Sequence, residues 1–591
     1  MTKAFTRAIL SATCAAASLA LLQAQGRGGG EWTTSAYDAQ RSAWLRADAR
    51  LTPDAVKKGE FAFLWKAKFD NEARQLNSLS TPILLDRLIG YRGFKSLAFI
   101  GGSADRVIAI DTDLAKPYWM TVLNYSANTG GPPPSSWQCP GGLIATPSRR
   151  TVIIPQAPGG RGGGGGRAGA RNGSAVGEPG RGAAILSQMA AARAAAPAAA
   201  APGAPGAAAA PGGRGAGATG APGAPGAPNA GGGRAVAPIG FGGVDPVFAM
   251  GSDGLLHTLL SSNGADAEPP APFLPPHAKP SSLLWGDGVL YTTTSDGCGA
   301  APNAVWAIDL TAKDQKPVTT WATGGPNVAG TGPAFATDGT LYVALGRGAG
   351  TYSSAVVALD RYTLQPKDWF SAPDADFNTS PIVFRSRDKD LVAVTANDGR
   401  LYLLDAASLG GDDHKTPLHV TAKFTAPGAG AALATWEDQA GTRWILAPVA
   451  GAPQSGTRFT ANGLALSGSV VAFKLADEGT PPTLQPAWRS RDLTSPLGPI
   501  VVNGMVFAVS SGEYRPAGSG QGTAPLTAAQ RAQRSVPAVL YILDGATGRT
   551  LWSSGTKITS FARAGLSASA GQVYLVTFDN HLYAFGIPME H

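Results

Sequence analysis

The chain has 591 residues, of which 44% are hydrophobic and 15% are charged, so it is globular but too long for one simple core. Its formal charge of +8 is concentrated in two places, a leader with Lys3 and Arg7 and a stretch at 158–240 with seven arginines and one glutamate. Because about zero net charge is left for the remainder, a basic binding groove and a nucleic-acid partner are excluded.

Residues 1–25 are predicted to be a secretory signal peptide. Two basic residues precede an apolar run from Ala8 to Leu22, and small and polar residues follow it. The run is too short and too rich in alanine for a membrane anchor, and Cys14 lies too early, in a poor context, for lipidation. We therefore expect a periplasmic or secreted protein with no transmembrane segment.

Residues 31–60 are expected to form an N-terminal extension before the first strand. Residues 31–51 are polar with spaced aromatics, and LTPDAVKKG at 51–59 predicts a capped turn. The next stretch, FAFLWKAKF at 61–69, alternates like a strand and carries Trp65.

One pattern then recurs: apolar runs of strand length alternate with tight turns, and a run that ends near an Asp is followed by a Trp. Asp309, Asp360 and Asp405 lie 51 and 45 residues apart, which is the period of a four-stranded propeller blade. About eight copies are visible, and helical periodicity is nearly absent. The sequence therefore predicts an all-β fold, an eight-bladed β-propeller of four-stranded blades spanning 61–157 and 241–588.

The clearest copy is LYILDGATGRTLWSSGTKI at 540–558. Two apolar runs flank a turn in which Asp544 and Thr547 can hydrogen-bond to the backbone and Gly548 tolerates a positive φ. Trp552 follows at a fixed distance, so its ring is expected to lie across a neighbouring sheet. Tryptophans at this place in six units are expected to dock one blade on the next: Trp65, Trp119, Trp321, Trp369, Trp488 and Trp552.

The last copy stops after its third strand, at Phe585, six residues before the chain ends. The missing fourth strand would carry a Trp, and the stretch at 61–69 is similar to TLWSSGTKI of the preceding copy. We expect this N-terminal strand to complete the last blade and close the ring, because closure removes exposed sheet edges.

Residues 158–240 interrupt the second copy with Gly, Ala, Pro and Arg. This composition cannot bury enough apolar surface to offset the entropy of ordering, so a disordered low-complexity insert is expected. It would be a solvated tether or an arginine-rich arm for anionic envelope surfaces. Whether TVIIPQ at 151–156 forms a first or a second strand is left open.

The unit from Leu543 to Trp552 resembles the tryptophan-docking repeat of quinoprotein-type propellers, the PQQ-like repeat, and degenerate forms occur at 109–119 and 358–369. The segment at 32–44 is also similar to the usual start of such chains. The resemblance implies the propeller fold but leaves two functions open. Some members are alcohol or sugar dehydrogenases that hold pyrroloquinoline quinone and calcium in the channel. Others, such as the outer-membrane assembly propeller lipoprotein, bind proteins without a cofactor.

The residues that the dehydrogenase members use are not evident in the sequence. The chain has no adjacent cysteine pair and no Cys-x-x-Cys-His haem motif. Asp374, Asp376 and Asn378 in PDADFNTSP could offer oxygens to calcium, but a solvated turn is favoured. The six histidines show no metal spacing, and His414 and His419 are expected at the surface. No catalytic, cofactor-binding or metal residue is therefore assigned.

Two cysteines, Cys139 and Cys298, are left after removal of the signal peptide. Cys139 precedes the inner strand of the second blade, and Cys298 lies between the second and third strands of the third blade. Both kinds of loop emerge on the same face of a propeller, so a disulfide is a candidate in an oxidising compartment. Two unpaired thiols are the alternative.

The function predicted from these observations is that of an exported, monomeric scaffold whose loops bind a protein or a component of the cell envelope, with no cofactor. The alternative is a quinone- and calcium-dependent oxidoreductase of alcohols or sugars.

Overall fold

The computed structural model describes residues 31–90, 93–123, 135–150, 245–313, 315–426, 430–452, 456–478, 481–515 and 526–588. The predicted signal peptide at 1–25, the insert at 158–240 and the undecided strand at 151–156 lie outside these residues. The described residues belong to one compact unit of the chain.

Eight antiparallel sheets follow one another along this unit, and we number them as blades in chain order. Blade 1 contains β3 (Ile83–Gly90), β4 (Gly93–Gly102), β5 (Arg106–Asp111) and β6 (Lys116–Val122). Blade 2 contains β7 (Pro246–Met250), β8 (Leu255–Leu260) and β9 (Ala271–Pro272), and Ser148 bridges to Phe248 at its inner edge. Blade 3 contains β10 (Leu284–Gly286), β11 (Val289–Thr294), β12 (Ala304–Asp309) and β13 (Val318–Ala322), with the short η1 (Cys298–Ala300) between β11 and β12. Blade 4 contains β14 (Ala334–Phe335), β15 (Leu341–Ala344), β16 (Ala355–Leu359) and β17 (Pro366–Ser371).

The second half of the chain repeats this order. Blade 5 contains β18 (Ile382–Ser386), β19 (Lys389–Thr395), β20 (Leu401–Asp405) and β21 (His419–Val420). Blade 6 contains β22 (Ala434–Glu437), β23 (Arg443–Ala450), β24 (Thr460–Ala461), β25 (Gly468–Ala476) and β26 (Thr483–Arg489). Blade 7 contains β27 (Ile500–Val502), β28 (Met505–Ser510), β29 (Val539–Asp544) and β30 (Thr550–Ser553). Blade 8 contains β31 (Ser567–Ser569), β32 (Gln572–Val576), β33 (His581–Gly586) and β2 (Ala62–Lys68).

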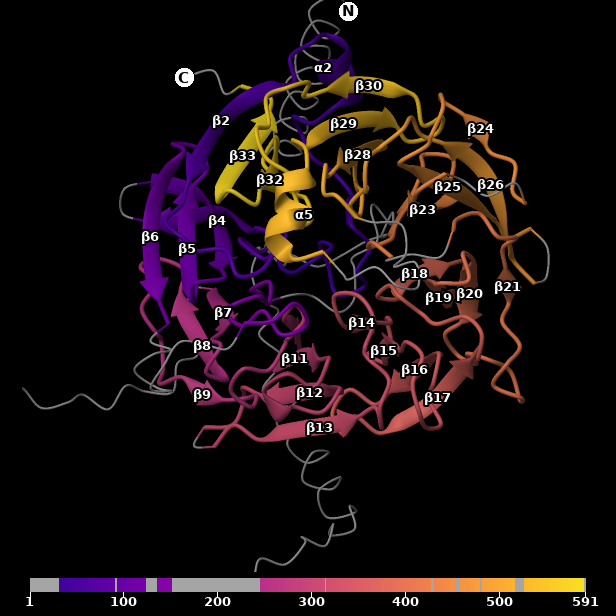
Figure 1. The fold of residues 1–591 in the computed structure, drawn as a ribbon, viewed down its shortest axis with the longest axis horizontal. Helices are drawn as coiled ribbons and strands as arrows, with labels where there is room; N and C mark the ends of the chain where they lie inside the picture. The colour runs from indigo at the N-terminus through magenta and orange to yellow at the C-terminus, as the bar shows by residue number, and fades with distance from the viewer. Residues whose placement is uncertain are drawn as a thin grey trace, which may run out of the picture. The chain divides into compact units, whose positions relative to one another are not determined.

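The blades stand around a common centre, as Figure 1 shows, and the predicted eight-bladed propeller is confirmed. The second and third strands of the blades carry mostly buried apolar residues, whereas the outermost strands alternate between exposed and half-buried ones. This pattern arises because the inner strands are covered on both faces by neighbouring blades, while the outer strands also meet solvent.

The predicted turn of the repeat is also confirmed. Asp544 accepts hydrogen bonds from the backbone amide of Thr547 at 2.8 Å and from its hydroxyl at 2.7 Å, and Gly548 has a φ of 73°. Asp360 makes the equivalent bonds in blade 4, to the amides of Tyr362 and Thr363. Aspartate is therefore the residue that fixes the turn between the third and fourth strands.

The ring closes as predicted from the sequence. Strand β2 pairs antiparallel with β33, with Phe63 opposite Phe585 and Lys68 opposite His581. Because β2 comes from the start of the propeller sequence and β33 from its end, this sheet joins the two ends of the ring.

Several elements were not predicted. Strand β1 (Trp44–Leu45) adds to blade 7 in parallel with β27, and β24 adds to blade 6 in parallel with β26. The predicted capped turn at 51–59 contains a short helix, α2 (Pro53–Lys57), whose Ala55 amide donates to the Thr52 hydroxyl at 3.2 Å. A second helix, α5 (Ala528–Arg534), interrupts blade 7 between β28 and β29. No helix in the described residues is long and apolar enough to cross a membrane.

Candidate functional site

A cavity of about 490 Å³ lies at the centre of the ring. Its lining comes mainly from the short segments that precede the inner strands of seven blades, at 79–81, 143–146, 330–331, 378–380, 430–432, 497–499 and 564–566. These segments lie on the same end of the ring as the loops between the second and third strands, because successive strands of a blade are antiparallel. We call this end the mouth. A concave site of this size is large enough for a small organic ligand.

The N-terminal segment 32–45 also lines the cavity, through Ser35, Ala36 and Ala43. Its backbone binds the inner strands one after another. The carbonyl of Trp32 accepts from the amide of Leu84 in blade 1 at 2.7 Å, and the carbonyl of Ala43 accepts from the amide of Val501 in blade 7 at 2.9 Å. Between these two contacts the segment also binds blades 2 to 6, at Arg149, Leu283, Phe335, Val383 and Thr435.

The charged wall of the cavity is built around Glu513, which follows β28 and is 0% exposed at its side chain. One carboxylate oxygen lies 2.9 Å from Nε of Arg515. The other lies 2.6 Å from Nη2 of Arg531 and 3.3 Å from Nε of Arg563. Arg515 and Arg563 line the cavity. Three guanidinium groups around one carboxylate leave an excess of positive charge at the cavity wall.

Burial lowers the pKa of Arg563, the Glu513 carboxylate raises it, and the neighbouring Arg515 and Arg531 lower it further. The net shift of this pKa is downward, but an arginine remains charged in any physiological range. No sequence pattern marks this cluster, because its members lie up to 50 residues apart in loops between strands.

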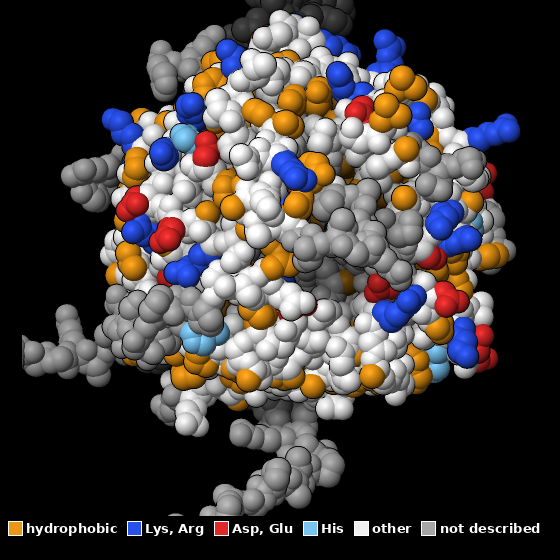
Figure 2. Space-filling model, in the orientation of Figure 1, with side chains coloured by type: hydrophobic (Ala, Val, Ile, Leu, Met, Phe, Trp, Pro, Cys, Tyr) orange, Lys and Arg blue, Asp and Glu red, His pale blue; other side chains and the backbone are white. Residues whose placement is uncertain are grey.

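The edge of the mouth carries exposed aromatic and basic side chains. The guanidinium carbon of Arg531, on α5, lies 4.6 Å from the ring centre of Trp137, which is 48% exposed. Arg534 lies 5.5 Å from the ring centre of Tyr514, which is 36% exposed. We call Trp137, Tyr514, Arg531, Arg534 and the exposed Val536 the rim patch. Figure 1 places α5 near the centre of the ring, and Figure 2 shows a basic side chain over it, whereas most other charged groups of this face lie toward the periphery.

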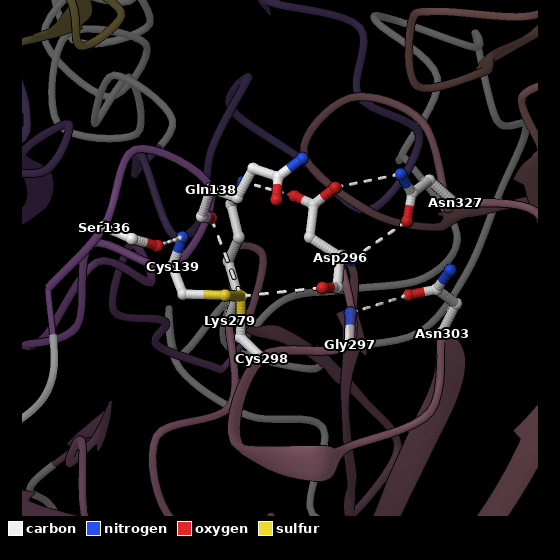
Figure 3. The surroundings of a disulfide bond; sticks show 9 residues. All are labelled: Ser136, Gln138, Cys139, Lys279, Asp296, Gly297, Cys298, Asn303 and Asn327. Carbon is white, nitrogen blue, oxygen red and sulfur yellow. Dashed lines mark hydrogen bonds and ion pairs between the residues drawn. A yellow bond between two sulfur atoms is a disulfide. The ribbon is translucent and has the colours of Figure 1, made fainter. Parts of the chain in front are cut away.

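Cys139 and Cys298 form a disulfide, with their Cα atoms 5.5 Å apart. The bond joins η1 of blade 3 to the loop before blade 2, in which Cys139 lies two residues after Trp137. Figure 3 shows how the surrounding loop is held: Asp296 forms an ion pair with Lys279 at 2.6 Å and accepts from the Asn327 amide at 3.0 Å. The disulfide thus ties together two loops of the mouth.

The six predicted tryptophans differ in their surroundings. The indole N–H of Trp119 donates to the carbonyl of Ser261 at 2.9 Å, and that of Trp488 donates to the carbonyl of Gly545 at 3.0 Å. Each acceptor belongs to the turn between the third and fourth strands of the following blade. The other four tryptophans contact aromatic rings. Trp65 lies near Tyr574, and both Trp321 and Trp369 pack against Tyr352. Trp552 packs against Phe61 and Phe585.

In the loop that could have offered calcium ligands, the carboxylate of Asp376 already accepts hydrogen bonds from protein groups. The carboxylate of Asp376 accepts from the amide of Arg347 at 2.7 Å and from the side chain of Asn397 at 2.5 Å. Asn378 lines the cavity, and its side-chain amide also donates to Asn397. In the part of the chain that the structure describes, no group of three His, Cys, Asp or Glu residues is placed to hold a metal ion.

His414 and His419 do not meet. The His414 ring stacks on Trp369 with their centroids 3.7 Å apart, and its Nδ1 lies 3.2 Å from Asp368. Nδ1 of His419 accepts instead from the amide of Leu484 at 3.3 Å, on blade 6.

The propeller is similar to solved quinoprotein structures. A quinohemoprotein alcohol dehydrogenase from Pseudomonas putida aligns with a TM-score of 0.52 and 11% identity, over 95% of this chain and 82% of that chain. The quinohemoprotein alcohol dehydrogenase from Comamonas testosteroni aligns with a TM-score of 0.49 and 12% identity, over 97% of this chain and 82% of that chain. No protein-family model matches the chain, and no curated protein matches its sequence significantly. The likeness to the Pseudomonas enzyme shows that the fold is that of the quinoprotein-type propeller.

The cavity residues fit the two components of a quinone–calcium site unequally. Arg515 and Arg563 suit a quinone that carries carboxylates. Calcium requires several converging oxygens, with carboxylates preferred, yet the described lining contains no Asp or Glu side chain. Two nearby guanidinium groups would also repel a divalent cation. The described residues therefore do not fit a calcium-bound quinone.

Proposed function

We propose that the protein is an exported, monomeric binding propeller, which uses the mouth of its channel to bind a protein or a component of the cell envelope. The rim patch is the observation that carries this proposal. Partly exposed aromatic rings paired with arginines are the side chains that most often dominate the energy of binding surfaces. Here they lie beside a cavity with excess positive charge, to which Arg531 is linked through Glu513. Among the described residues, the most exposed aromatic outside the mouth is Phe94, in β4 of blade 1.

The test compares variants in co-sedimentation with purified cell envelopes. Trp137→Ala and Tyr514→Ala each remove an exposed ring of the rim patch, and Phe94→Ala removes an exposed ring beside the β3–β4 turn, at the end of the ring away from the mouth, as a matched control. We expect wild type and the Phe94 variant to sediment equally and the two rim variants to lose most of their binding. Equal sedimentation of all four proteins, or of none, would contradict the proposal.

A quinone-dependent oxidoreductase is the second candidate. The fold shared with an alcohol dehydrogenase and the two cavity arginines favour it. The paired donors of Arg515 and Arg563 suit the carboxylates of such a quinone, whereas the described lining lacks the carboxylates that its calcium would need. Reconstitution of the purified protein with pyrroloquinoline quinone and calcium, followed by dye reduction with primary alcohols and aldoses, tests this candidate. Activity that disappears in Arg563→Gln would support it, and no dye reduction would remove it.

A further inference from the structure

Arg515 and Arg563 contact Glu513 in a way that leaves their ends available. Each approaches the carboxylate with Nε, at 2.9 Å and 3.3 Å, and not with its terminal amino groups. Among the described residues, no acceptor contacts those terminal groups. A guanidinium presents two parallel N–H donors at its end, so both residues can still bind a planar oxyanion.

Arg531 has a different position. Its Nη2 forms an ion pair with Glu513, and its Nε donates a hydrogen bond to the carbonyl of Tyr514 at 3.2 Å. Its guanidinium group lies over the ring of Trp137. It is absent from the cavity lining, whereas Arg515 and Arg563 are part of it. Arg531 therefore holds Glu513 and the rim in place, while the other two arginines face the ligand space.

The remaining lining is uncharged. Hydroxyl side chains such as Ser80, Thr81 and Thr379 alternate with small or apolar residues such as Leu143, Ala432 and Phe578. An inorganic anion would use only the arginines and would leave this apolar surface wet. A ligand with one anionic end and an uncharged body would use both.

We infer that the channel cavity binds an organic carboxylate, whose carboxyl group accepts hydrogen bonds from the terminal amino groups of Arg515 and Arg563. The uncharged body of the ligand lies along the hydroxyl and apolar lining of the cavity. This inference rests on the proposed function, for which it names the chemical group that the mouth recognises. The carboxylate belongs either to a small free acid or to the C-terminus of a peptide chain.

The full chain is titrated calorimetrically with hexanoate, with hexanamide as its neutral counterpart, and with inorganic phosphate. Two further probes, a tripeptide with a free C-terminus and the same tripeptide amidated, distinguish the sources. We expect a carboxylate to bind and the matching amide to bind at least about tenfold more weakly, since a charged hydrogen bond is lost. A tripeptide acid that binds more tightly than hexanoate identifies a chain end, and the opposite order identifies a small acid.

Variants locate the site. Arg563→Gln is expected to weaken carboxylate binding by about tenfold or more, and Arg549→Gln, an exposed arginine in a turn of blade 7, serves as the control. Arg515→Lys keeps the charge but loses the paired donors, so it should also bind more weakly even if the Gln variant does not fold. Equal binding of acid and amide, unchanged affinity in the Arg515 and Arg563 variants, or phosphate binding as tight as any acid would overturn the inference.

The two proposals fail separately. If the Arg563 variant loses carboxylate binding but still sediments with envelopes as wild type does, the inference of a carboxylate site in the cavity is supported. Envelope binding then does not depend on that site. If wild type binds envelopes through the rim patch but binds none of the acids, the proposed function survives and the inference is wrong.

Discussion

At the scale of single residues, Gly548 has two reasons to lack a side chain. Its φ of 73° is left-handed, which the sequence pattern predicted. A Cβ at this position would also overlap the ring of Trp488 from the preceding blade, which the sequence did not reveal. Gly264 stands in the same relation to Trp119. The glycine of the repeat therefore lets the indole approach the turn closely enough to donate to its backbone.

Gly548→Ala is expected to destabilise the protein by about 2–4 kcal/mol, because strain at positive φ adds to overpacking against Trp488. Gly555→Ala is the matched control, since Gly555 has a φ of 54° with no atom near its missing Cβ, and should cost only about 1 kcal/mol. Urea unfolding of both variants measures the difference. Equal losses would mean that blade docking by Trp488 does not depend on this glycine.

The aspartate of the repeat gives a pH-dependent prediction. Burial raises the pKa of Asp360, but hydrogen bonds from Thr363 and Tyr362 and the charge of Lys367 outweigh burial, so the net pKa is below its usual value. The stability that ionised Asp360 contributes is then complete above the unfolded pKa and is lost as the pH falls through the lower folded pKa.

Asp360→Ala is therefore expected to lower the Tm at pH 7, with a cost of about 1–3 kcal/mol for the lost charged hydrogen bonds. The gap between wild type and variant should shrink as the pH falls below about 4. Thermal unfolding between pH 3 and pH 7 measures this gap, and a gap that is constant with pH would contradict the assignment.

At the scale of elements, the strands and the turn chemistry followed from sequence because both depend on local pattern. Alternating apolar runs identify strands, and Asp with Gly identifies the turn, whatever the distant surroundings. The N-terminal segment could not be predicted in this way. Its path is fixed by single hydrogen bonds to seven blades, and Ala36, Tyr37, Arg41 and Ala43 all have positive φ there. Nothing in its local sequence, which lacks glycine between 31 and 51, indicates that backbone.

Arg41 is the residue that explains how this segment holds its path. Its side chain is buried and donates to the carbonyls of Pro333 at 3.0 Å and Ser35 at 2.8 Å. It also donates to Thr331 at 3.4 Å, and burial lowers its pKa to about 10. The guanidinium thus replaces the donors that a strand partner would give to these carbonyls.

Arg41→Met keeps the apolar stem but removes every donor, so several buried carbonyls lose their partners. We expect a loss of about 3–5 kcal/mol in the free energy of unfolding. Arg50→Met is the control, because Arg50 is exposed, and it should cost about 1 kcal/mol or less. Chemical denaturation of both proteins distinguishes a buried anchor from a general need for basic residues in this segment.

At the scale of the whole molecule, the ring is a closed chain of blades whose ends meet at one seam. The sequence predicted which face of the ring carries the site, because the topology places the loops of Cys139 and Cys298 on the same face. It did not predict the site residues themselves. Glu513 and its arginines meet through connections whose length and path the repeat does not specify. The seam itself is a long-range contact between the first and last strands. Its integrity depends on packing across blades 7 and 8 as well as on the β2–β33 ladder.

Phe61, just before β2, packs beside this seam, across the interface between blades 8 and 7. Its ring is 1% exposed and lies 4.8 Å from the ring of Trp552 and 5.9 Å from that of Phe507, both in blade 7. Phe61→Ala is expected to cost about 3–5 kcal/mol, and Phe94→Ala, at an exposed position, close to nothing. Because the lost contacts lie between blades 7 and 8, next to the seam, amide exchange should rise in β2, β30 and β33 while blades 3 to 5 keep their protection. Faster exchange spread evenly over all eight blades would show instead that the ring opens as one cooperative unit, with no special weakness where its ends meet.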